Sequence, residues 1–95
     1  MLKIQLSVVV LTKNEEANIM RALRSVKPVV DEMIVVDTGS TDRTKNIAKV
    51  FGAKVYDYPW TNSFSDARNF SISKAKQQEQ LLILQQQLSK QKKKH

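Results

Sequence analysis

The chain has 95 residues and no cysteine, which allows one small domain with a modest core and excludes a disulfide framework or a thiolate metal site. Apolar residues make up 41% of the chain, as in a folded protein. The net charge of +7 is uneven, because residues 1–75 carry 11 Lys/Arg against 8 Asp/Glu and residues 76–95 carry 5 lysines against 1 glutamate. The larger, nearly balanced part gives no indication of a nucleic-acid-binding face.

The N-terminal part predicts a buried strand followed by a helix. Residues 6–12, "LSVVVLT", form a continuous β-branched run typical of a strand buried on both faces. This run is too short to span a membrane and no small-residue cleavage site follows it, so we expect a soluble, cytoplasmic protein. Residues 14–26 have apolar positions at i, i+4 and i+7, which predicts a helix with two glutamates in its first turn and Pro28 as its stop.

The middle of the chain repeats this alternation. Residues 33–37, "MIVVD", predict a second buried strand. Residues 41–52, "TDRTKNIAKVFG", predict a helix with Thr41 or Ser40 as its N-cap and Gly52 just past its end.

A third unit follows with the same order. Residues 53–58, "AKVYDY", predict a strand closed by Pro59, and residues 64–75, "FSDARNFSISKA", predict a helix with Ser65 as its cap. Strands and helices that alternate at this spacing indicate βαβ units. We therefore expect an α/β fold with a Rossmann-like parallel sheet and flanking helices.

The sequence changes character near Lys76. Residues 76–95 contain seven glutamines, an apolar island at residues 81–84 and a lysine-rich end. We divide the chain into an α/β domain over residues 1–76 and a Gln/Lys-rich tail over residues 77–95, which is disordered or forms one short strand or helix. The basic end is either a solvated terminus or a weak contact for an anionic membrane surface, which would make the protein peripheral to the membrane.

Polar residues stand at the ends of the first two predicted strands. Thr12, Asn14 and Glu15 end the first strand, and Asp37 ends the second. Ligands of open parallel sheets bind outside the carboxyl ends of the strands. No Gly-rich phosphate motif follows the first strand, so a ligand here would be a nucleotide held by its base and ribose. The alternative for Asp37 is that it only ends a strand before a capped helix.

Three motifs in order, "KNEE", "VVDTGSTD" and "ARNF", resemble the N-terminal half of a family 2 glycosyltransferase of the GT-A fold, over about residues 5–75. The resemblance implies an inverting transferase that uses a nucleotide-diphospho-sugar, usually UDP-linked, with a divalent metal, Mn or Mg. It places Thr12 near the base with Asn14 and Glu15 in the same loop, and it assigns Asp37 to the uridine. It has Arg68 facing the nucleotide pocket, and the alternative for Arg68 is an exposed helix residue.

The chain departs from the family after the third motif. The family continues with a strand and an Asp-x-Asp metal motif, whereas glutamines occupy positions 85–87 here. A neutral amide is a poor ligand for Mg²⁺ or Mn²⁺. We assign no catalytic or metal-binding residue and expect the chain alone to be inactive. The alternatives are a non-catalytic nucleotide-binding or interaction module, and a basic-tailed binder of anionic surfaces.

Overall fold

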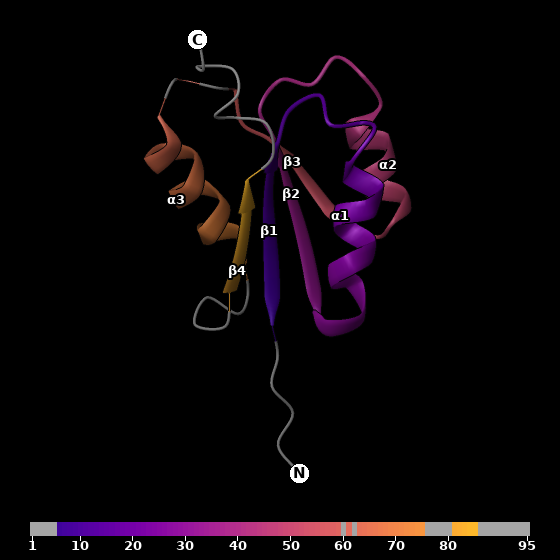
Figure 1. Cartoon of the computed structure of the whole chain (residues 1–95). Coiled ribbons are helices and arrows are strands. Elements are labelled where there is room, and N and C mark those ends of the chain that lie inside the picture. Colours follow the sequence, from indigo (N-terminus) through magenta and orange to yellow (C-terminus); the bar gives the residue numbers. More distant parts are fainter. Residues whose placement is uncertain (1–5, 60, 62, 76–80, 86–95) are drawn as a thin grey trace, which may run out of the picture.

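The computed structural model describes residues 6–59, 61, 63–75 and 81–85. These residues form a four-stranded sheet in the order β3-β2-β1-β4 with helices on both faces (Figure 1). Every strand pair in it is parallel. The expected Rossmann-like α/β class is confirmed. The elements are β1 (Ser7–Thr12), α1 (Ile19–Val26), the 3-10 helix η1 (Lys27–Val29), β2 (Glu32–Asp37), α2 (Thr44–Val50), β3 (Lys54–Asp57), α3 (Phe64–Lys74) and β4 (Leu81–Gln85).

The core is divided by the sheet into two apolar clusters. Val8 and Val10 of β1 pack on the side of α1 and α2, whereas Val9 and Leu11 pack on the side of α3. Because both faces of β1 are covered, its sequence is continuously apolar rather than alternating. On the α3 side, Phe70 stacks on Tyr58 with ring centroids 4.7 Å apart.

Helix α1 begins five residues later than the sequence predicts. Asn14 has a left-handed backbone with φ 50°, which interrupts a helix, and the Glu15 carbonyl accepts from the amides of Asn18 at 2.9 Å and Ile19 at 2.7 Å. Glu15 and Glu16 therefore lie in the turn before α1, and the prediction that they occupy its first turn is wrong.

The predicted N-caps of α2 are also wrong, whereas the prediction that Gly52 lies just past its end is confirmed. Helix α2 begins at Thr44, and its N-cap position is Arg43, whose side chain makes no capping bond. Ser40 does not cap the helix, because it lies four residues before Thr44 and its hydroxyl oxygen accepts from the Asn14 amide instead. Gly52 follows the end of α2 with φ 89°, in the left-handed region that favours glycine.

Helix α3 has a side-chain cap, but at a different serine from the predicted one. The amide of Asp66 donates to Ser63 Oγ at 3.2 Å, so Ser63 is the N-cap and Ser65 lies inside the helix. None of the helices within the described residues is both long and apolar enough to cross a membrane.

The apolar island that the sequence left open forms β4. This strand pairs parallel with β1, with Leu11 opposite Gln85 at the end of the register. The connections through α1 and α2 lead away from β1 on one side, whereas the connection through α3 returns to its other side (Figure 1). Strand order thus reverses at β1. The division of the chain at residue 76 stays an expectation, and residues 86 and 87 lie outside the described residues.

Candidate functional site

The carboxyl ends of the strands bring three polar residues into one row. Thr12 of β1 is the register partner of Asp37 of β2, which is in turn the partner of Asp57 of β3. The amide and hydroxyl of Thr38 both donate to the Thr12 carbonyl, at 3.0 and 3.1 Å. This row begins at the strand where the sheet order reverses, which is where doubly wound sheets bind ligands.

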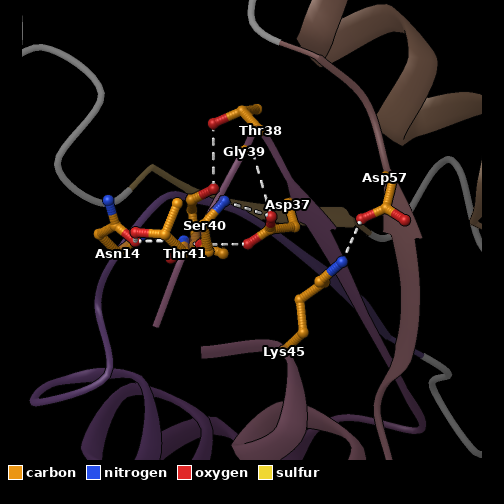
Figure 2. Close-up of polar contacts among 9 residues, drawn as sticks. Asn14, Asp37, Thr38, Gly39, Ser40, Thr41, Lys45 and Asp57 are labelled. Carbon is orange, nitrogen blue, oxygen red and sulfur yellow. Dashed lines mark hydrogen bonds and ion pairs between the residues drawn. The ribbon is translucent and has the colours of Figure 1, made fainter. Parts of the chain in front are cut away.

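The Asp37 carboxylate organises the turn that follows β2. Its Oδ2 accepts from the amides of Gly39 at 3.1 Å and Ser40 at 2.8 Å, and its Oδ1 accepts from the Ser40 hydroxyl (Figure 2). The residue is only 2% exposed. A carboxylate has about four acceptor positions, so about one on Oδ1 is left unused by the described residues. Asp37 therefore has a turn-forming role that the sequence alone did not reveal.

Gly39 makes this turn possible. Its φ is 117°, a backbone conformation that residues with a Cβ rarely adopt. The conformation directs the amides of residues 39 and 40 toward the same carboxylate oxygen. The glycine at position 39 is thus required by the turn around Asp37.

The loops after β1 and β2 are joined by a row of hydrogen bonds that we call the loop junction, formed by residues 14–16 and 40–44. Three successive amides of the first loop donate to side chains of the second: Asn14 to Ser40 Oγ at 2.8 Å, Glu15 to Thr44 Oγ1 at 2.8 Å, and Glu16 to Asp42 Oδ2 at 3.1 Å. Sequence reasoning missed this junction. The sequence feature that could have indicated it is the number of hydroxyl and carboxyl groups in residues 40–44, which exceeds what one helix cap requires.

In the loop junction, amides of the second loop also donate hydrogen bonds to side chains of the first loop. Asn14 Oδ1 accepts from the Thr41 amide at 2.7 Å, and Glu16 Oε1 accepts from the Arg43 amide at 3.2 Å. Burial alone would raise the pKa of Asp42, but hydrogen bonds from the hydroxyl and amide of Thr44 and from the Glu16 amide hold that pKa below its ordinary value of 3.8. Asp42 is thus adapted to be ionised in this junction.

Glu15 lies beneath the first loop rather than on the surface. The residue is 3% exposed, and its Oε1 accepts from Asn18 Nδ2 at 3.0 Å. Its Oε2 is buried and has no hydrogen-bond partner among the residues that the structure describes. A ligand could reach this oxygen only if the loop opened, so the predicted role of Glu15 in nucleotide binding is indirect in this conformation.

Arg68 stands apart from the other four predicted site residues. It lies on α3, which packs on the opposite face of the sheet from α1 and α2, and its side chain is half-buried. The structure brings Thr12, Asn14, Glu15 and Asp37 together, and in the part of the chain that it describes no hydrogen bond or ion pair joins Arg68 to them.

A lysine that the sequence did not single out lies at the same edge. Lys45 Nζ donates to Asp57 Oδ1 at 3.0 Å (Figure 2). This hydrogen bond and the charge of Asp57, together with the charge of Asp37, raise the pKa of Lys45 above 10.5. The edge thus carries a fixed cation beside its two aspartates.

The described residues do not fit the metal ion that the family resemblance implies. In residues 6–59, 61, 63–75 and 81–85, no three His, Cys, Asp or Glu side chains are grouped so that they could hold an ion. At the strand ends, Asp37 already accepts three hydrogen bonds and Asp57 is paired with Lys45. A divalent cation prefers several free carboxylate oxygens.

The fold and the row of polar strand ends define the class of α/β domains that bind ligands at a sheet switch point. Residues 7–85 match the family model described as "Glycosyl transferase family 2", and the chain belongs to this family. The family resemblance expected from the three sequence motifs is thus confirmed.

Known proteins with similar sequences and structures agree. An uncharacterized glycosyltransferase of Rickettsia typhi is 57% identical over 56 residues, which are 59% of this chain and 19% of that protein. A TPR repeat-containing protein of Synechococcus elongatus is 46% identical over 71 residues, which are 75% of this chain and 18% of that protein. The crystal structure of glucosyl-3-phosphoglycerate synthase from Mycobacterium tuberculosis, with Mn²⁺, UDP and glucosyl-3-phosphoglycerate, matches with a TM-score of 0.70 and 30% identity, covering 85% of this chain and 33% of that one.

The chain therefore spans about a fifth of these two relatives and a third of this solved protein.

Proposed function

We propose that this chain carries the nucleotide-binding part of a glycosyltransferase and binds a UDP-linked sugar at the carboxyl edge of its sheet. The observation that carries the proposal is the register row of Thr12, Asp37 and Asp57 at the point where strand order reverses. The similar synthase from Mycobacterium tuberculosis was solved with UDP, which supports uracil as the base.

The predicted residues divide between direct and indirect roles. Asp37 takes one hydrogen bond from the uridine through its remaining acceptor position, and Thr12 lies next to it in the register. Asn14 and Glu15 contribute by shaping the first loop, because Asn14 Oδ1 and Glu15 Oε1 accept hydrogen bonds within the fold. Arg68 on α3 is assigned a positive charge for the nucleotide on the family resemblance alone, because it lies apart from the other four residues.

The complete family reaction is an inverting sugar transfer with a divalent metal, and we propose that this chain alone does not carry it out. The described residues offer no ligand set for the metal, and the chain covers a third of the solved synthase. A cytoplasmic location, and a weak contact of the lysine-rich end with an anionic membrane surface, are proposed on the sequence alone.

A second candidate is a non-catalytic nucleotide-binding module. It is favoured by the two edge aspartates, whose carboxylates are already engaged by Ser40 and Lys45 rather than free for a metal. The two candidates share the nucleotide site and differ in whether a longer chain restores transfer.

The test is a calorimetric titration of the full chain with UDP, UDP-glucose and ADP, each with and without Mn²⁺. The proposal expects UDP and UDP-glucose to bind and ADP to bind at least about tenfold more weakly. Equal affinity for UDP and ADP, or no binding of either, would contradict it. Binding that is independent of Mn²⁺ favours the module, and strong Mn²⁺ dependence favours a transferase site.

A further inference from the structure

The hydroxyl of Ser40 lies between the two loops at the candidate nucleotide edge. It accepts from the Asn14 amide at 2.8 Å and donates to Asp37 Oδ1 (Figure 2). A serine hydroxyl carries one proton. Because the Ser40 oxygen accepts a hydrogen bond from the Asn14 amide, its own proton must point in another direction. The Asn14 amide therefore fixes the Ser40 hydroxyl in the orientation that donates to Asp37.

The chain contains a second bridge of the same construction. Thr44 Oγ1 accepts from the Glu15 amide at 2.8 Å and donates to Asp42 Oδ1. Both bridges join adjacent amides of the first loop to a carboxylate of the second. They differ in their carboxylate, because the Thr44 bridge ends on Asp42 and does not touch Asp37. Thr44 is fully buried, whereas Ser40 is half-buried.

We infer that Ser40 is a positioning residue for the nucleotide site, holding the Asp37 carboxylate so that its remaining acceptor position has one direction. The inference rests on the proposed function, in which Asp37 binds the nucleotide. The amides of Gly39 and Ser40 both hold Oδ2, so the Ser40 hydroxyl is the contact that fixes Oδ1. Without the hydroxyl, Oδ1 has two free acceptor positions instead of one. Water and the ligand then compete for both positions, and the ligand's hydrogen bond no longer has a single direction.

Two further features favour positioning over a purely structural role. The Ser40 bridge crosses from one strand-end loop to the other, so a shift of either loop would move Asp37 Oδ1. The stability of the loop junction does not depend on Ser40 alone, because Glu15, Glu16 and Asn14 make other bonds to the second loop. Loss of the hydroxyl should thus affect the ligand more than the fold.

The experiment compares Ser40→Ala, Ser40→Thr and Thr44→Val in the full chain, with UDP titration and denaturant unfolding of each. We expect Ser40→Ala to weaken UDP binding about tenfold with a small change in the unfolding midpoint. Ser40→Thr keeps the hydroxyl and should recover affinity to within about threefold of the parent. Thr44→Val should lower the unfolding midpoint and leave UDP affinity within about twofold. Asp42→Ala breaks the same control bridge from its other end if Thr44→Val does not fold.

Parent-like UDP binding by Ser40→Ala would overturn the inference. Equal losses of affinity in Ser40→Ala and the Thr44 or Asp42 control would also overturn it, because both bridges would then act only on the fold.

A measurement without nucleotide separates this inference from the proposed function. In Ser40→Ala we expect faster exchange of the Asn14 amide and a shifted NMR signal of the Asp37 carboxyl carbon. In Thr44→Val we expect faster exchange of the Glu15 amide and an unshifted Asp37 signal. Failure of the parent chain to bind UDP would refute the proposed function, whereas an unchanged Asp37 signal in Ser40→Ala would refute the positioning role itself.

Discussion

Thr12 and Asp37 are direct register partners at the last paired position of β1 and β2. They are 25 residues apart in the sequence, as their numbers show. Parallel pairing aligns the two strand ends, so the loops that follow them meet at one edge. The Thr12 carbonyl is also occupied by two bonds from Thr38. The position of Thr12 beside Asp37 is therefore fixed both by strand pairing and by the hydrogen bonds from Thr38.

Replacing Asp37 tests the assigned nucleotide contact. We expect Asp37→Asn to weaken UDP binding about tenfold to a hundredfold, because a charge-assisted hydrogen bond contributes about 1.5–3 kcal/mol. Calorimetry with UDP measures the change. Asp66→Asn in the first turn of α3 is the matched control and should bind like the parent. An Asp37→Asn variant with parent-like affinity would refute the assignment.

Sugar transfer by this chain is expected to be absent. The measurement is UDP release from UDP-glucose and other common UDP-sugars over hours, with Mn²⁺ and, in parallel, with a chelator. We expect both rates to equal the background hydrolysis, since the described residues hold no metal-ligand group. Release above background that the chelator abolishes would contradict this expectation.

The lowered pKa of Asp42 predicts a contribution to acid stability. Because hydrogen bonds from Thr44 and Glu16 lower this pKa below 3.8 in the folded state, ionised Asp42 stabilises the fold above that value. The contribution is lost as the pH falls through the lowered pKa. As the pH is lowered from about 6 to about 2, the unfolding midpoint should fall less steeply for Asp42→Asn than for the parent. The same pH dependence of the unfolding midpoint in both proteins would show that the charge of Asp42 does not stabilise the loop junction.

Glu15 is expected to tolerate loss of its charge. Glu15→Gln keeps an oxygen for the bond from Asn18 and removes the charge from a buried carboxylate whose Oε2 has no partner. Burying an uncompensated charge is costly, so we expect the free energy of unfolding to stay the same or rise by about 1 kcal/mol. Denaturant unfolding measures this, with Glu15→Ala as the contrast that loses the Asn18 bond. Destabilisation of Glu15→Gln as large as that of Glu15→Ala would indicate that the charge is needed.

Hydrogen exchange tests the fourth strand. In an edge strand alternate amides bond to the neighbour, so about half of the amides in β4 should exchange slowly, together with those of β1. We expect a free energy of unfolding of only a few kcal/mol, as small domains have. Uniformly fast exchange across residues 81–85 would show that this segment does not pair in solution.

The sequence determined the first three strands and the class of fold. The apolar runs at residues 6–12 and 33–37 are continuous because both faces of β1 and β2 are buried, and this pattern is visible without a structure. The existence and order of the helices were predictable, but their first residues were not, since α1 and α2 begin later than predicted. The three motifs indicated the family that the comparison confirms. The candidate residues Thr12 and Asp37 could be named because strand ends are recognisable in the sequence.

The tertiary structure decided how the polar residues are used. Ser40 was a plausible helix cap by type and position, yet its hydroxyl bonds to Asp37 and Asn14 because pairing of β1 with β2 brings their loops together. Local preference cannot show a contact across 26 residues of chain. The same holds for β4, since an apolar island of residues 81–84 fits several structures, and it forms a strand because the exposed edge of β1 is available to pair with it.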